Sequence, residues 1–593
     1  MVTLNICNVR TNIIGALHKD RVKCNDIHAA LRVECSFLVP GAEWSPAYKS
    51  GAWDGLISLY EKRAQSFPTG LLPRILNILK QQGIEYKLVD SRIKAVRNLN
   101  ITTRFGEYGR RLYDYQKMAA ERAFKASRGI IAVGTGGGKT YITCQIIADI
   151  GAGPILVIVP SISLLKQTRD ELAKNIAIDG KPAKIGMIGD GICEIEPDGI
   201  NLCTYQTSLS AFNEKFVESR NKIEQDELVG ESNRKTFEQL QEAYNKAKSV
   251  FNSVHKYSLQ KQSVERDRLD KLKSDVSSQS KQHLDEIKKL ETRLDKELSA
   301  MVKVQKSDYK KAEDALNTRI LSRENKEKIR NLFKRAQTIM VDEAHIAAIV
   351  IEALCGHADR AYYKYGMSAT PWREDNQEIR IEGCLGRKLV HIPPTYLIEN
   401  NYLVPPKIFM VQINHIEDSD NYNDAYDKHI VHCWERNYRI KQFAEAFKEA
   451  GKPVMIICDR IKHGQILEAM IQDSIFVPGS DKGEDDPGDE EQDYRKRMLN
   501  ACERNEKILI GTQWMNTGID APAITVLIMA GSIQSSSTVL QTIGRVLRLS
   551  PETGKTEAII IDFMDNEKNM HKHSIARKRV YQSESAFVLK MIK

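Results

Sequence analysis

A glycine-rich loop between an apolar run and a helical pattern constrains this chain more than any other feature. The run GIIAV (129–133) leads into GTGGGKT (134–140), and YITCQIIADI (141–150) follows. Glycines let successive backbone N–H groups turn inward around phosphate oxygens, and the new helix points its positive end at them. Lys139 would reach the β- and γ-phosphates and Thr140 would bind Mg²⁺. We predict an ATP-binding loop here; the alternative is a plain glycine-rich turn, because the strict pattern has glycine at 133 and this chain has valine.

A pair of adjacent acids supplies the second half of such a site. Asp342-Glu343-Ala344-His345 ends the strand-like run TIMVD, about 200 residues after the loop. Neighbouring residues at a strand end point to opposite sides, so one acid can face a metal and the other a water molecule. We expect Asp342 to hold Mg²⁺ through water and Glu343 to orient and deprotonate the attacking water.

Two arginines could supply the positive charge that γ-phosphate transfer needs. They lie in Gln541-Thr-Ile-Gly-Arg545-Val-Leu-Arg548, three residues apart, which predicts that both occupy one helix face. Such arginines stabilise the charge that develops on the phosphate. A solvated helix face is the alternative. A second Gly-Lys-Thr, at 554–556, has no glycine-rich loop before it and is predicted to be a simple turn.

Short apolar runs predict the fold class. They are rich in valine and isoleucine, end in glycine or polar turns and alternate with helical patterns, as in parallel sheets covered on both faces. The runs are 129–138, 154–161, 336–343, 452–459, 507–512, 524–531 and 557–563. We predict an α/β protein with two RecA-like parallel-sheet domains. A small α+β domain precedes them, and a basic tail ends the chain.

A long helical insertion is predicted inside the first of these domains. No proline occurs between Pro197 and Pro371, and no glycine between Gly230 and Gly356. Apolar residues recur at heptad spacing from Phe237 to Val254, which predicts a coiled-coil-like hairpin over 214–336. Residues 214–335 hold 29 Lys+Arg and 22 Asp+Glu, a net +7 of the chain's +9. The insertion is either a solvated spacer or an arm that grips DNA or a partner.

The predicted boundaries follow these patterns. They are 1–100 for the leading domain, 101–213 and 337–405 for the two parts of the first RecA-like domain, 214–336 for the insertion and 406–593 for the second RecA-like domain. An acidic segment, 481–493, lies within the last. The 11 cysteines are scattered without a CxxC pair, and no apolar run reaches 18 residues. We therefore expect a protein of a reducing cytoplasm that does not enter a membrane.

The three site elements together resemble superfamily 2 helicases, and further motifs match in the family's order over about 101–213 and 337–565. Gln116 in LYDYQ resembles the glutamine that reads adenine. PSISLLKQ (160–167) and Thr204-Tyr205-Gln206 resemble strand-contacting motifs, and Ser368-Ala369-Thr370 resembles the motif that couples hydrolysis to movement. TQWMNTGID (512–520) resembles the motif that bridges nucleotide and nucleic acid.

The leading segment narrows the resemblance to the phage UvsW helicase group. YKSGAWDGLISLY (48–60) and FPTGLL (67–72) are similar to its small first domain, and QTIGRVLR and AIIIDFMDN (558–566) to its later motifs. The resemblance implies an ATP-dependent DNA helicase on branched DNA that migrates junctions, regresses forks and unwinds RNA–DNA loops in phage recombination, repair and replication. This chain has alanine third in DEAH where the best-known member has cysteine. Nothing known of the group assigns the insertion a role.

The resemblance also implies roles for single residues. Catalysis would use Lys139, Asp342, Glu343, Arg545 and Arg548. ATP would be held by Gln116, Gly134, Thr135, Gly136, Gly137, Gly138, Lys139, Thr140, Gly518 and Asp520, and Mg²⁺ by Thr140 and Asp342. Coupling would use His345, Ser368, Thr370 and Gln541. Nucleic acid would contact Ser163, Gln167, Thr204, Gln206, Thr512 and Trp53.

Several alternatives stay open on the sequence. Trp53 either stacks on DNA or packs the small domain, and the basic run HKHSIARKRV (571–580) either contacts phosphates or forms a solvated helix. The whole protein could instead be a restriction-system motor, an RNA helicase or a strand-annealing protein that uses ATP as a release switch. The expected partners are branched, duplex and single-stranded DNA, with recombination or single-strand-binding proteins, and the expected state is a monomer in the host cytoplasm.

Overall fold

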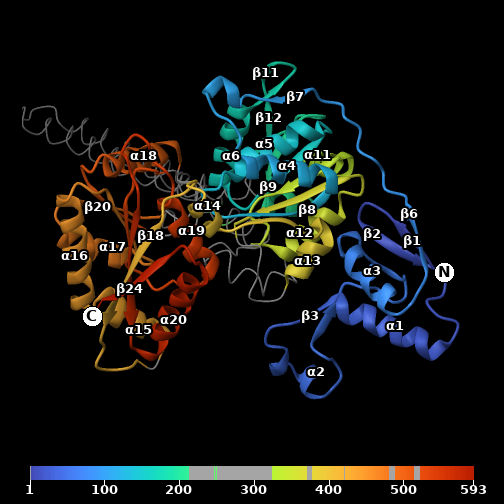
Figure 1. The fold of residues 1–593 in the computed structure, drawn as a ribbon, viewed down its shortest axis with the longest axis horizontal. Coiled ribbons are helices and arrows are strands. Elements are labelled where there is room, and N and C mark those ends of the chain that lie inside the picture. Colours follow the sequence, from blue (N-terminus) through green and yellow to red (C-terminus); the bar gives the residue numbers. More distant parts are fainter. Residues whose placement is uncertain are drawn as a thin grey trace, which may run out of the picture. The chain divides into compact units, whose positions relative to one another are not determined.

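The computed structural model describes residues 2–212, 246, 249, 323–369, 377–419, 421–479, 488–512, 521–533 and 535–592 (Figure 1). Chain contacts separate two units, Met1–Glu218 with Ile329–Lys593, and Ser219–Lys328. Of the predicted hairpin, 214–336, the structure describes only residues 246, 249 and 323–336, which include α11 (Arg323–Arg335). Residues 481–487 of the acidic segment also lie outside the described residues. The predicted domain boundaries stay predictions.

A mainly parallel sheet carries the phosphate loop. Its order is β13-β12-β14-β9-β15-β16-β8-β17, and only the edge strand β13 is antiparallel. The strands are β8 (Arg128–Val133), β9 (Ile155–Val159), β12 (Ile185–Gly189), β13 (Ile192–Glu194), β14 (Ile200–Thr204), β15 (Thr338–Val341), β16 (Tyr363–Ser368) and β17 (Lys388–Ile392). Strands β9, β14 and β15 are buried along their whole length, as expected for strands covered on both faces.

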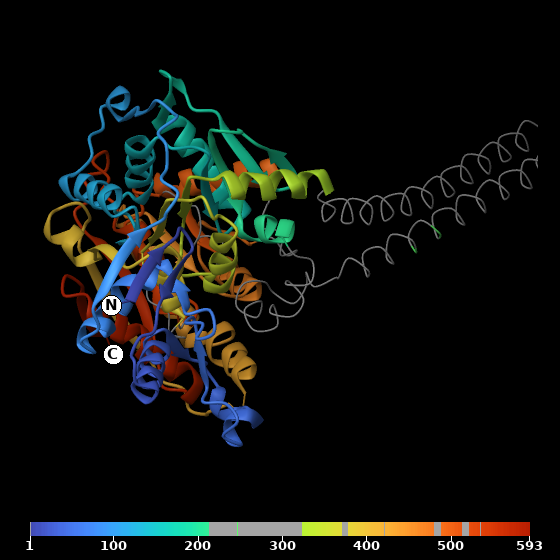
Figure 2. The ribbon, with the colours of Figure 1, turned by 90° about the vertical axis from the view of Figure 1, so that its right-hand side faces the viewer.

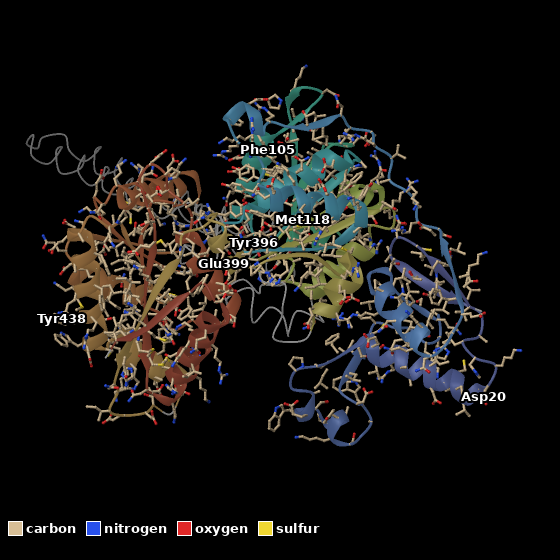
Figure 3. The ribbon with its side chains drawn as sticks, viewed as in Figure 1. Asp20, Phe105, Met118, Tyr396, Glu399 and Tyr438 are labelled. Atoms are coloured by element: carbon tan, nitrogen blue, oxygen red, sulfur yellow. The ribbon has the colours of Figure 1, made fainter. Side chains whose placement is uncertain are left out.

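Helices and a small side sheet surround this first sheet. The helices are α4 (Asp114–Ala126), α5 (Lys139–Ile150), α6 (Ile162–Asn175), α7 (Tyr205–Phe212), α11, α12 (Ala348–Gly356), α13 (Glu378–Leu385) and α14 (Pro394–Glu399). The side sheet pairs β7 (Ile101–Thr103), β10 (Ile176–Ile178) and β11 (Lys181–Pro182). Phe105, Met118, Tyr396 and Glu399 mark this region in Figure 3.

The second sheet is parallel throughout its described strands, in the order β20-β21-β19-β22-β23-β18-β24. They are β18 (Pro406–Ile413), β19 (Val454–Ile457), β20 (Ser474–Val477), β21 (Ile508–Gly511), β22 (Val526–Met529), β23 (Ala558–Asp565) and β24 (Val588–Ile592). Its helices are α15 (Tyr422–Tyr426), a π-helical turn (Asp427–Val431), α16 (Trp434–Glu449), α17 (Ile461–Met470), α18 (Gly488–Glu503), α19 (Ser536–Val546) and α20 (Lys568–Ser583).

Successive side chains along the strands of the second sheet point to opposite faces, so the sheet has a core on each face. Val454 and Ile456 of β19 pack with α16 and α17, whereas Met455 and Ile457 point to the opposite face, where α19 and α20 contribute. Figure 1 shows α16 and α17 on one side of the sheet and α19 and α20 on the other. The two RecA-like parallel sheets predicted from the apolar runs are confirmed, and all seven runs contain strands.

The leading residues form a separate α+β layer. Its sheet has the order β5-β2-β1-β6, and β1 is antiparallel to β2 and parallel to β6. The elements are β1 (Val2–Ile6), β2 (Arg10–Ile14), α1 (Arg21–Glu34), β3 (Ser36–Leu38), α2 (Pro46–Lys49), β4 (Leu56–Ser58), β5 (Ser66–Pro68), α3 (Leu72–Gln81) and β6 (Tyr86–Asp90). Asp20 caps α1 (Figure 3), and the blue ribbon of Figure 2 shows this layer from the side.

The expectation of a basic tail is wrong. Residues 571–580 belong to α20, and the chain then returns to the sheet as β24. Arg577 is fully buried, and its guanidinium donates to the Asp562 carboxylate at 2.8 Å. The run therefore belongs in part to the core, because a buried acid on β23 needs a cation from the helix that covers it.

Candidate nucleotide and nucleic-acid site

The phosphate loop has the backbone that its glycines predict. Gly136 and Gly138 have φ angles of +86° and +74°, in the left-handed region that favours glycine. Gly138 is the N-cap residue of α5, so the helix starts at Lys139. A β-carbon on Gly137 would lie 2.5 Å from the Val133 side chain. The loop is thus wound tightly between β8 and α5, with the helix N-terminus opening onto it, as a phosphate cradle requires.

The lysine of this loop forms an ion pair with the second acid of DEAH. Lys139 Nζ contacts Glu343 Oε1 across 204 positions of sequence, because β8 and β15 both deliver their carboxyl ends to this edge. Burial opposes the charge on Lys139, but the Glu343 and Asp342 carboxylates outweigh it and raise the pKa of the lysine. A γ-phosphate brought to this loop would offer Lys139 a second anionic partner and would leave Glu343 available to a water molecule.

The two acids differ in their electrostatics. Burial raises the pKa of Asp342 to about 6, against the opposing charge of Lys139. Burial would also raise the pKa of Glu343, but Lys139, His345 and Arg545 outweigh it and lower the value. Within the described residues, the Asp342 carboxylate accepts one hydrogen bond, from the Glu343 backbone N–H at 2.9 Å. A buried acid with so few donors fits a divalent cation held together with Thr140.

Glu343 also has an unusual backbone. Its φ is +46°, a conformation that costs a non-glycine residue on the order of 1–3 kcal/mol. Two hydrogen bonds hold the neighbouring backbone: Tyr205 Oη donates to the Asp342 carbonyl at 2.6 Å, and Ala344 N donates to the Met367 carbonyl at 3.0 Å. The strain aims the Glu343 side chain at Lys139.

The predicted coupling residues lie beside these acids. His345 Nδ1 is 2.9 Å from Ser368 Oγ and 3.5 Å from Glu343 Oε2, which links the strand end of β16 to DEAH. Gln541 Nε2, on α19, donates to Glu343 Oε2 at 3.4 Å. The structure therefore brings His345 and Gln541 to the Glu343 carboxylate, and Ser368 is linked to it through His345. Thr370 lies outside the described residues.

The arginine motif approaches the phosphate loop through a glycine. A β-carbon on Gly544 would lie 2.5 Å from the Thr135 β-carbon, so only glycine allows α19 this close. The charge of Arg545 acts on both Glu343 and Lys139. The prediction that both arginines share a helix face is wrong for Arg548: α19 ends at Val546, and Arg548 pairs as a β-bridge with Leu403 while its side chain lies against Gly136.

The glutamine predicted to read adenine is buried under the loop. Gln116 Nε2 donates to the Gly137 carbonyl at 3.2 Å, and its Oε1 accepts from the Tyr113 backbone N–H at 3.0 Å. Tyr115 Oη donates to the same Gly137 carbonyl at 2.8 Å. Tyr402, which precedes β18, packs on Tyr113 with ring centroids 4.4 Å apart. The sequence analysis did not single out these tyrosines. Tyr113 and Tyr115 could have been found from their position beside Gln116, whereas Tyr402 lies far away in the sequence and gave no such signal.

The predicted strand-contacting residues divide into buried and exposed sets. Thr204 and Thr512 are buried, and their hydroxyls bond Thr207 Oγ1 at 2.9 Å and the Gly479 N–H at 2.8 Å. Ser163 is half-buried at the start of α6, where its hydroxyl is 3.0 Å from Ser161 Oγ. Gln167 and Gln206 are exposed. Gly518 and Asp520 lie outside the described residues, and all of these nucleic-acid and nucleotide roles stay predictions.

A second tryptophan is more accessible than the predicted one. Trp53 is half-buried, and its indole N–H donates to the Leu56 carbonyl at 3.0 Å, which supports the structural alternative. Trp44, in the same β3–β4 connection, is 74% exposed, with Lys49 Nζ 5.5 Å from its ring centroid. A cation beside an exposed aromatic face suits base stacking. The proline after WS, which starts α2, was the available signal for a projecting loop.

Two family models match the parts of the chain that build this site. "Type III restriction enzyme, res subunit" matches residues 110–233, and "Helicase conserved C-terminal domain" matches residues 438–550. They cover the phosphate loop and the arginine motif, in that order, on the two parallel sheets. The chain therefore carries the two domains of a superfamily 2 helicase.

Relatives of this helicase are viral and cellular. A protein of Sulfolobus islandicus filamentous virus, named as a candidate helicase with the number 22, is 28% identical over 44% of this chain and 48% of its own length. The ATP-dependent DNA helicase UvsW of phage T4 is 22% identical over 42% of this chain and 49% of its own length. The chain thus spans about half the length of these curated relatives. The crystal structure of T4 UvsW aligns with 100% of this chain and 99% of its own at 17% identity and a TM-score of 0.38.

The recognised resemblance to the UvsW group is therefore confirmed, and the domains are those of an ATP-dependent helicase. In the part of the chain that the structure describes, no helix is long and apolar enough to span a membrane. The second Gly-Lys-Thr lies in a turn before β23, as predicted, and Lys555 Nζ donates there to the Pro522 carbonyl at 2.9 Å.

Proposed function

We propose that this helicase uses ATP and Mg²⁺ to move along DNA and acts on branched DNA, in phage recombination, repair and replication. The observation that carries the ATPase half is the Lys139–Glu343 ion pair. It joins the phosphate loop to the DEAH acid; Gln541 of α19 donates to the same carboxylate, and the charge of Arg545 acts on it. The DNA half is supported by the name of the T4 relative, an ATP-dependent DNA helicase.

The chain's own groups divide the work of hydrolysis. The N-terminus of α5 and the loop N–H groups hold the phosphates, Lys139 neutralises them, and Glu343 accepts the proton of the attacking water. Mg²⁺, held by Thr140 and Asp342, would offset charge on the phosphate oxygens. Arg545 and Arg548 approach from the second sheet, so hydrolysis needs both sheets to contribute.

Movement follows from this division. Because α19 lies against the phosphate loop at Gly544, bound nucleotide and the arginine helix stabilise each other. Release of phosphate would remove that link and let the two sheets separate. DNA contacts made by each sheet would then tighten and loosen in turn, which carries the protein along a strand as a monomer. Recombination and single-strand-binding proteins, in the host cytoplasm, are the partners this activity would meet.

A panel of nucleic acids tests the substrate. ATP hydrolysis and strand separation are measured with a four-way junction, a fork, duplex DNA, single-stranded DNA and matched RNA. We expect the junction and the fork to stimulate hydrolysis most and to be unwound. Equal stimulation by RNA would favour an RNA helicase, and binding with annealing but no stimulated turnover would favour the ATP-switched annealing protein. Absence of stimulation by any branched DNA would overturn the proposal.

One alternative has an observation of its own. The match of residues 110–233 to a restriction-enzyme subunit family favours a restriction-system motor. Such a motor would hydrolyse ATP on plain duplex and displace a bound roadblock without separating strands. The same panel, with a streptavidin block on the duplex, distinguishes the two.

Trp44 gives a variant specific to DNA contact. Trp44→Ala should weaken junction binding by about 1–3 kcal/mol, the value of one stacked base. The matched aromatic control is Trp53→Phe, because the indole N–H of Trp53 donates to the Leu56 carbonyl. Equal junction affinity in wild type and Trp44→Ala would remove Trp44 from the contact surface.

A further inference from the structure

The segment that joins the two sheets packs directly against the phosphate loop. This connector, residues 394–405, begins with α14, which carries Tyr396 of Figure 3, and ends where β18 starts at Pro406. A β-carbon on three of the loop glycines would lie close to a connector residue: 3.1 Å from Pro394 at Gly134, 2.9 Å from Leu403 at Gly136 and 3.0 Å from Leu397 at Gly137. Loop and connector are therefore packed without space between them, so a shift of one moves the other.

The same connector is hydrogen-bonded to the second sheet's helices near both of its ends. At the start of α14, Thr395 Oγ1 donates to Glu584 Oε2 at 2.7 Å, and Glu584 is the C-cap residue of α20. At the other end, Val404 N donates to the Leu547 carbonyl at 2.8 Å, just after α19. The connector thus contacts the phosphate loop of one sheet and the arginine motif of the other.

Leu403 and Arg548 face each other across this contact. They form an antiparallel β-bridge, and the hydrogen bond from Val404 to Leu547 joins the residues that flank them. They are therefore a non-hydrogen-bonded pair, whose side chains lie close together on the same side. The geometry at Gly136 agrees, because a β-carbon there would lie 2.9 Å from Leu403 Cδ2 and 3.5 Å from Arg548 Cγ. Leu403 is 2% exposed, so its side chain is packed between the loop and the Arg548 stem.

The two arginines of the motif are held in different ways. Arg545 lies on α19, and its distance from the loop depends on the contact between Gly544 and Thr135. Arg548 lies beyond the end of α19 and is paired with the connector, which follows β17 of the first sheet along the chain. The position of Arg548 thus depends on Leu403 as well as on the helix.

We propose that Leu403 is a positioning residue that holds the Arg548 guanidinium at the phosphate loop. This role rests on the proposed ATP hydrolysis, in which Arg548 offsets charge on the phosphates. Leu403 packs on the apolar stem of Arg548, so the charged head has fewer conformations to search when nucleotide binds. Shortening Leu403 leaves a space into which the stem can move, and a displacement of about 1 Å costs on the order of 10²-fold in rate.

A double-mutant cycle tests this dependence. ATP hydrolysis is measured in Leu403→Ala, Arg548→Ala and the double variant, with the branched DNA that stimulates the wild type. We expect Leu403→Ala to lower kcat roughly 10–100-fold and to leave the KM for ATP near its wild-type value, because the loss is confined to the transition state. The double variant should be no slower than Arg548→Ala, because a positioning residue has no effect once the group that it positions is gone.

Two further variants separate positioning from a general loss of packing. Leu403→Met keeps the apolar volume and should restore most of the rate. Leu172→Ala truncates a fully buried leucine of α6 in the same core and should keep its hydrolysis rate per folded molecule.

Hydrogen exchange gives a readout that needs no hydrolysis. In the nucleotide-free protein, the Val404 N–H should exchange faster in Leu403→Ala than in Leu172→Ala, because the bridge to Leu547 is loosened. If Leu403→Ala does not fold, Leu403→Val, a smaller truncation, replaces it in the cycle and in the exchange measurement.

Two results would contradict the positioning role. One is a double variant that is slower than Arg548→Ala by the full factor of Leu403→Ala, since the two residues would then act independently. The other is an unchanged hydrolysis rate or unchanged Val404 exchange in Leu403→Ala. Failure of the proposed function would look different: the wild type itself would hydrolyse no ATP, and the exchange measurement would still test the bridge.

Discussion

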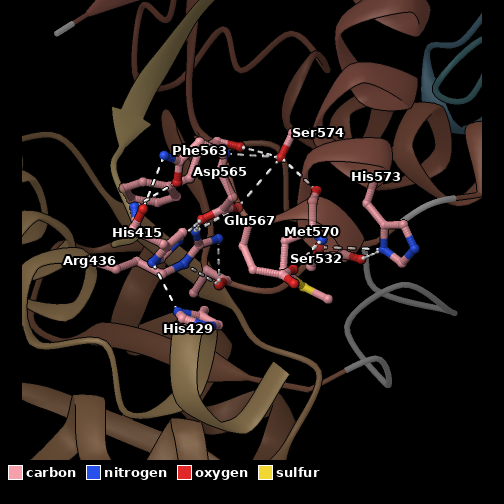
Figure 4. A network of polar contacts seen from close by, with 12 residues as sticks. His415, His429, Arg436, Ser532, Phe563, Asp565, Glu567, Met570, His573 and Ser574 are labelled. Atoms are coloured by element: carbon pink, nitrogen blue, oxygen red, sulfur yellow. Dashed lines mark hydrogen bonds and ion pairs between the residues drawn. The ribbon is translucent and has the colours of Figure 1, made fainter. Parts of the chain in front are cut away.

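The molecule holds two buried clusters of acids and bases that look alike in composition and differ in how fully they are satisfied. The cluster at the phosphate loop joins Lys139, Glu343 and Asp342. The cluster on the second sheet, drawn in Figure 4, joins Arg436, Asp565 and His415. In the second, Asp565 accepts from Arg436 at 2.8 and 3.1 Å and lies 3.0 Å from His415 Nε2.

In the second cluster, almost all of the hydrogen-bonding capacity of the charged groups is used. Arg436 also donates to the Ala530 and Gly531 carbonyls, and Ser574 donates to Asp565 at 3.4 Å. His429 extends this hydrogen-bond network, because its Nδ1 lies 3.2 Å from His415 Nδ1. At the phosphate loop, by contrast, Asp342 has a raised pKa and Glu343 sits on a strained backbone. A saturated cluster holds a fold together, whereas an under-satisfied one is ready to exchange partners with a ligand.

The largest expected effect tests the structural cluster. Asp565→Asn leaves the fully buried Arg436 without its counter-ion, which should lower the free energy of unfolding by about 3–5 kcal/mol. Hydrogen exchange along β22 and β23 measures this locally, since a chain of several domains need not unfold in one step. Asp473→Asn, which removes surface ion pairs with Lys448 and Lys507, is the control and should change little. Equal protection in both variants would contradict the assignment.

The next effect tests the functional cluster. Lys139→Ala should lower ATP hydrolysis by about 10²–10³-fold or more, because the phosphates lose their cation. Its effect on unfolding should be smaller than that of Asp565→Asn, since the site has few interactions to lose. The control is Lys555→Ala in the second Gly-Lys-Thr, which should keep its hydrolysis rate per folded molecule. An unchanged rate in Lys139→Ala would refute the site.

A smaller effect tests how the second sheet reaches the first. Gly544→Ala places a β-carbon 2.5 Å from that of Thr135, so α19 must move away from the loop. We expect kcat to fall roughly 10–100-fold, as for a catalytic group displaced by about 1 Å. Gly106→Ala has no heavy atom within 4 Å of the new carbon and is the matched control. Identical kcat values would show that the contact is dispensable.

The smallest expected effect is that ATP hydrolysis and the stability of the second sheet change in different pH ranges. Asp342, with a pKa raised to about 6, must be ionised to hold a metal, so hydrolysis should fall as pH drops through about 6. For stability the sign is opposite, since protonating a group with a raised pKa stabilises the fold. Burial opposes the charge on His415, but Asp565 outweighs it and raises the pKa to about 9. Its contribution is therefore complete below pH 6.5 and lost as pH rises through about 9.

A pH series checks both halves. Hydrolysis between pH 5 and 8 should show the acid limb while hydrogen-exchange protection of the second sheet stays constant. Between pH 7 and 10 that protection should decline, and His415→Gln should remove the decline. If activity and protection fell together on the acid side, the two clusters would not be separate.

Much of the fold and of the nucleotide site could be predicted from the sequence, because the signals for them are local. The phosphate loop needs glycines at adjacent positions, and the seven apolar runs needed only their own composition to indicate buried parallel strands. Strands such as β12 and β16 gave no comparable signal: MIG and KYG include glycines that shorten the apolar run. The helix-face prediction for Arg548 was wrong because spacing alone does not show where a helix ends.

The sequence by itself determined the chemistry of the site: a phosphate cradle, two acids and two arginines, each tied to its own short motif. Only the tertiary structure decided their relations. It showed that Glu343 pairs with Lys139 on a strained backbone, that Gly544 lets α19 reach Thr135, and that Arg577 of a basic run is buried against Asp562. The physical reason is that burial and pairing depend on residues 15 to more than 400 positions apart in sequence, which meet only when the sheets form.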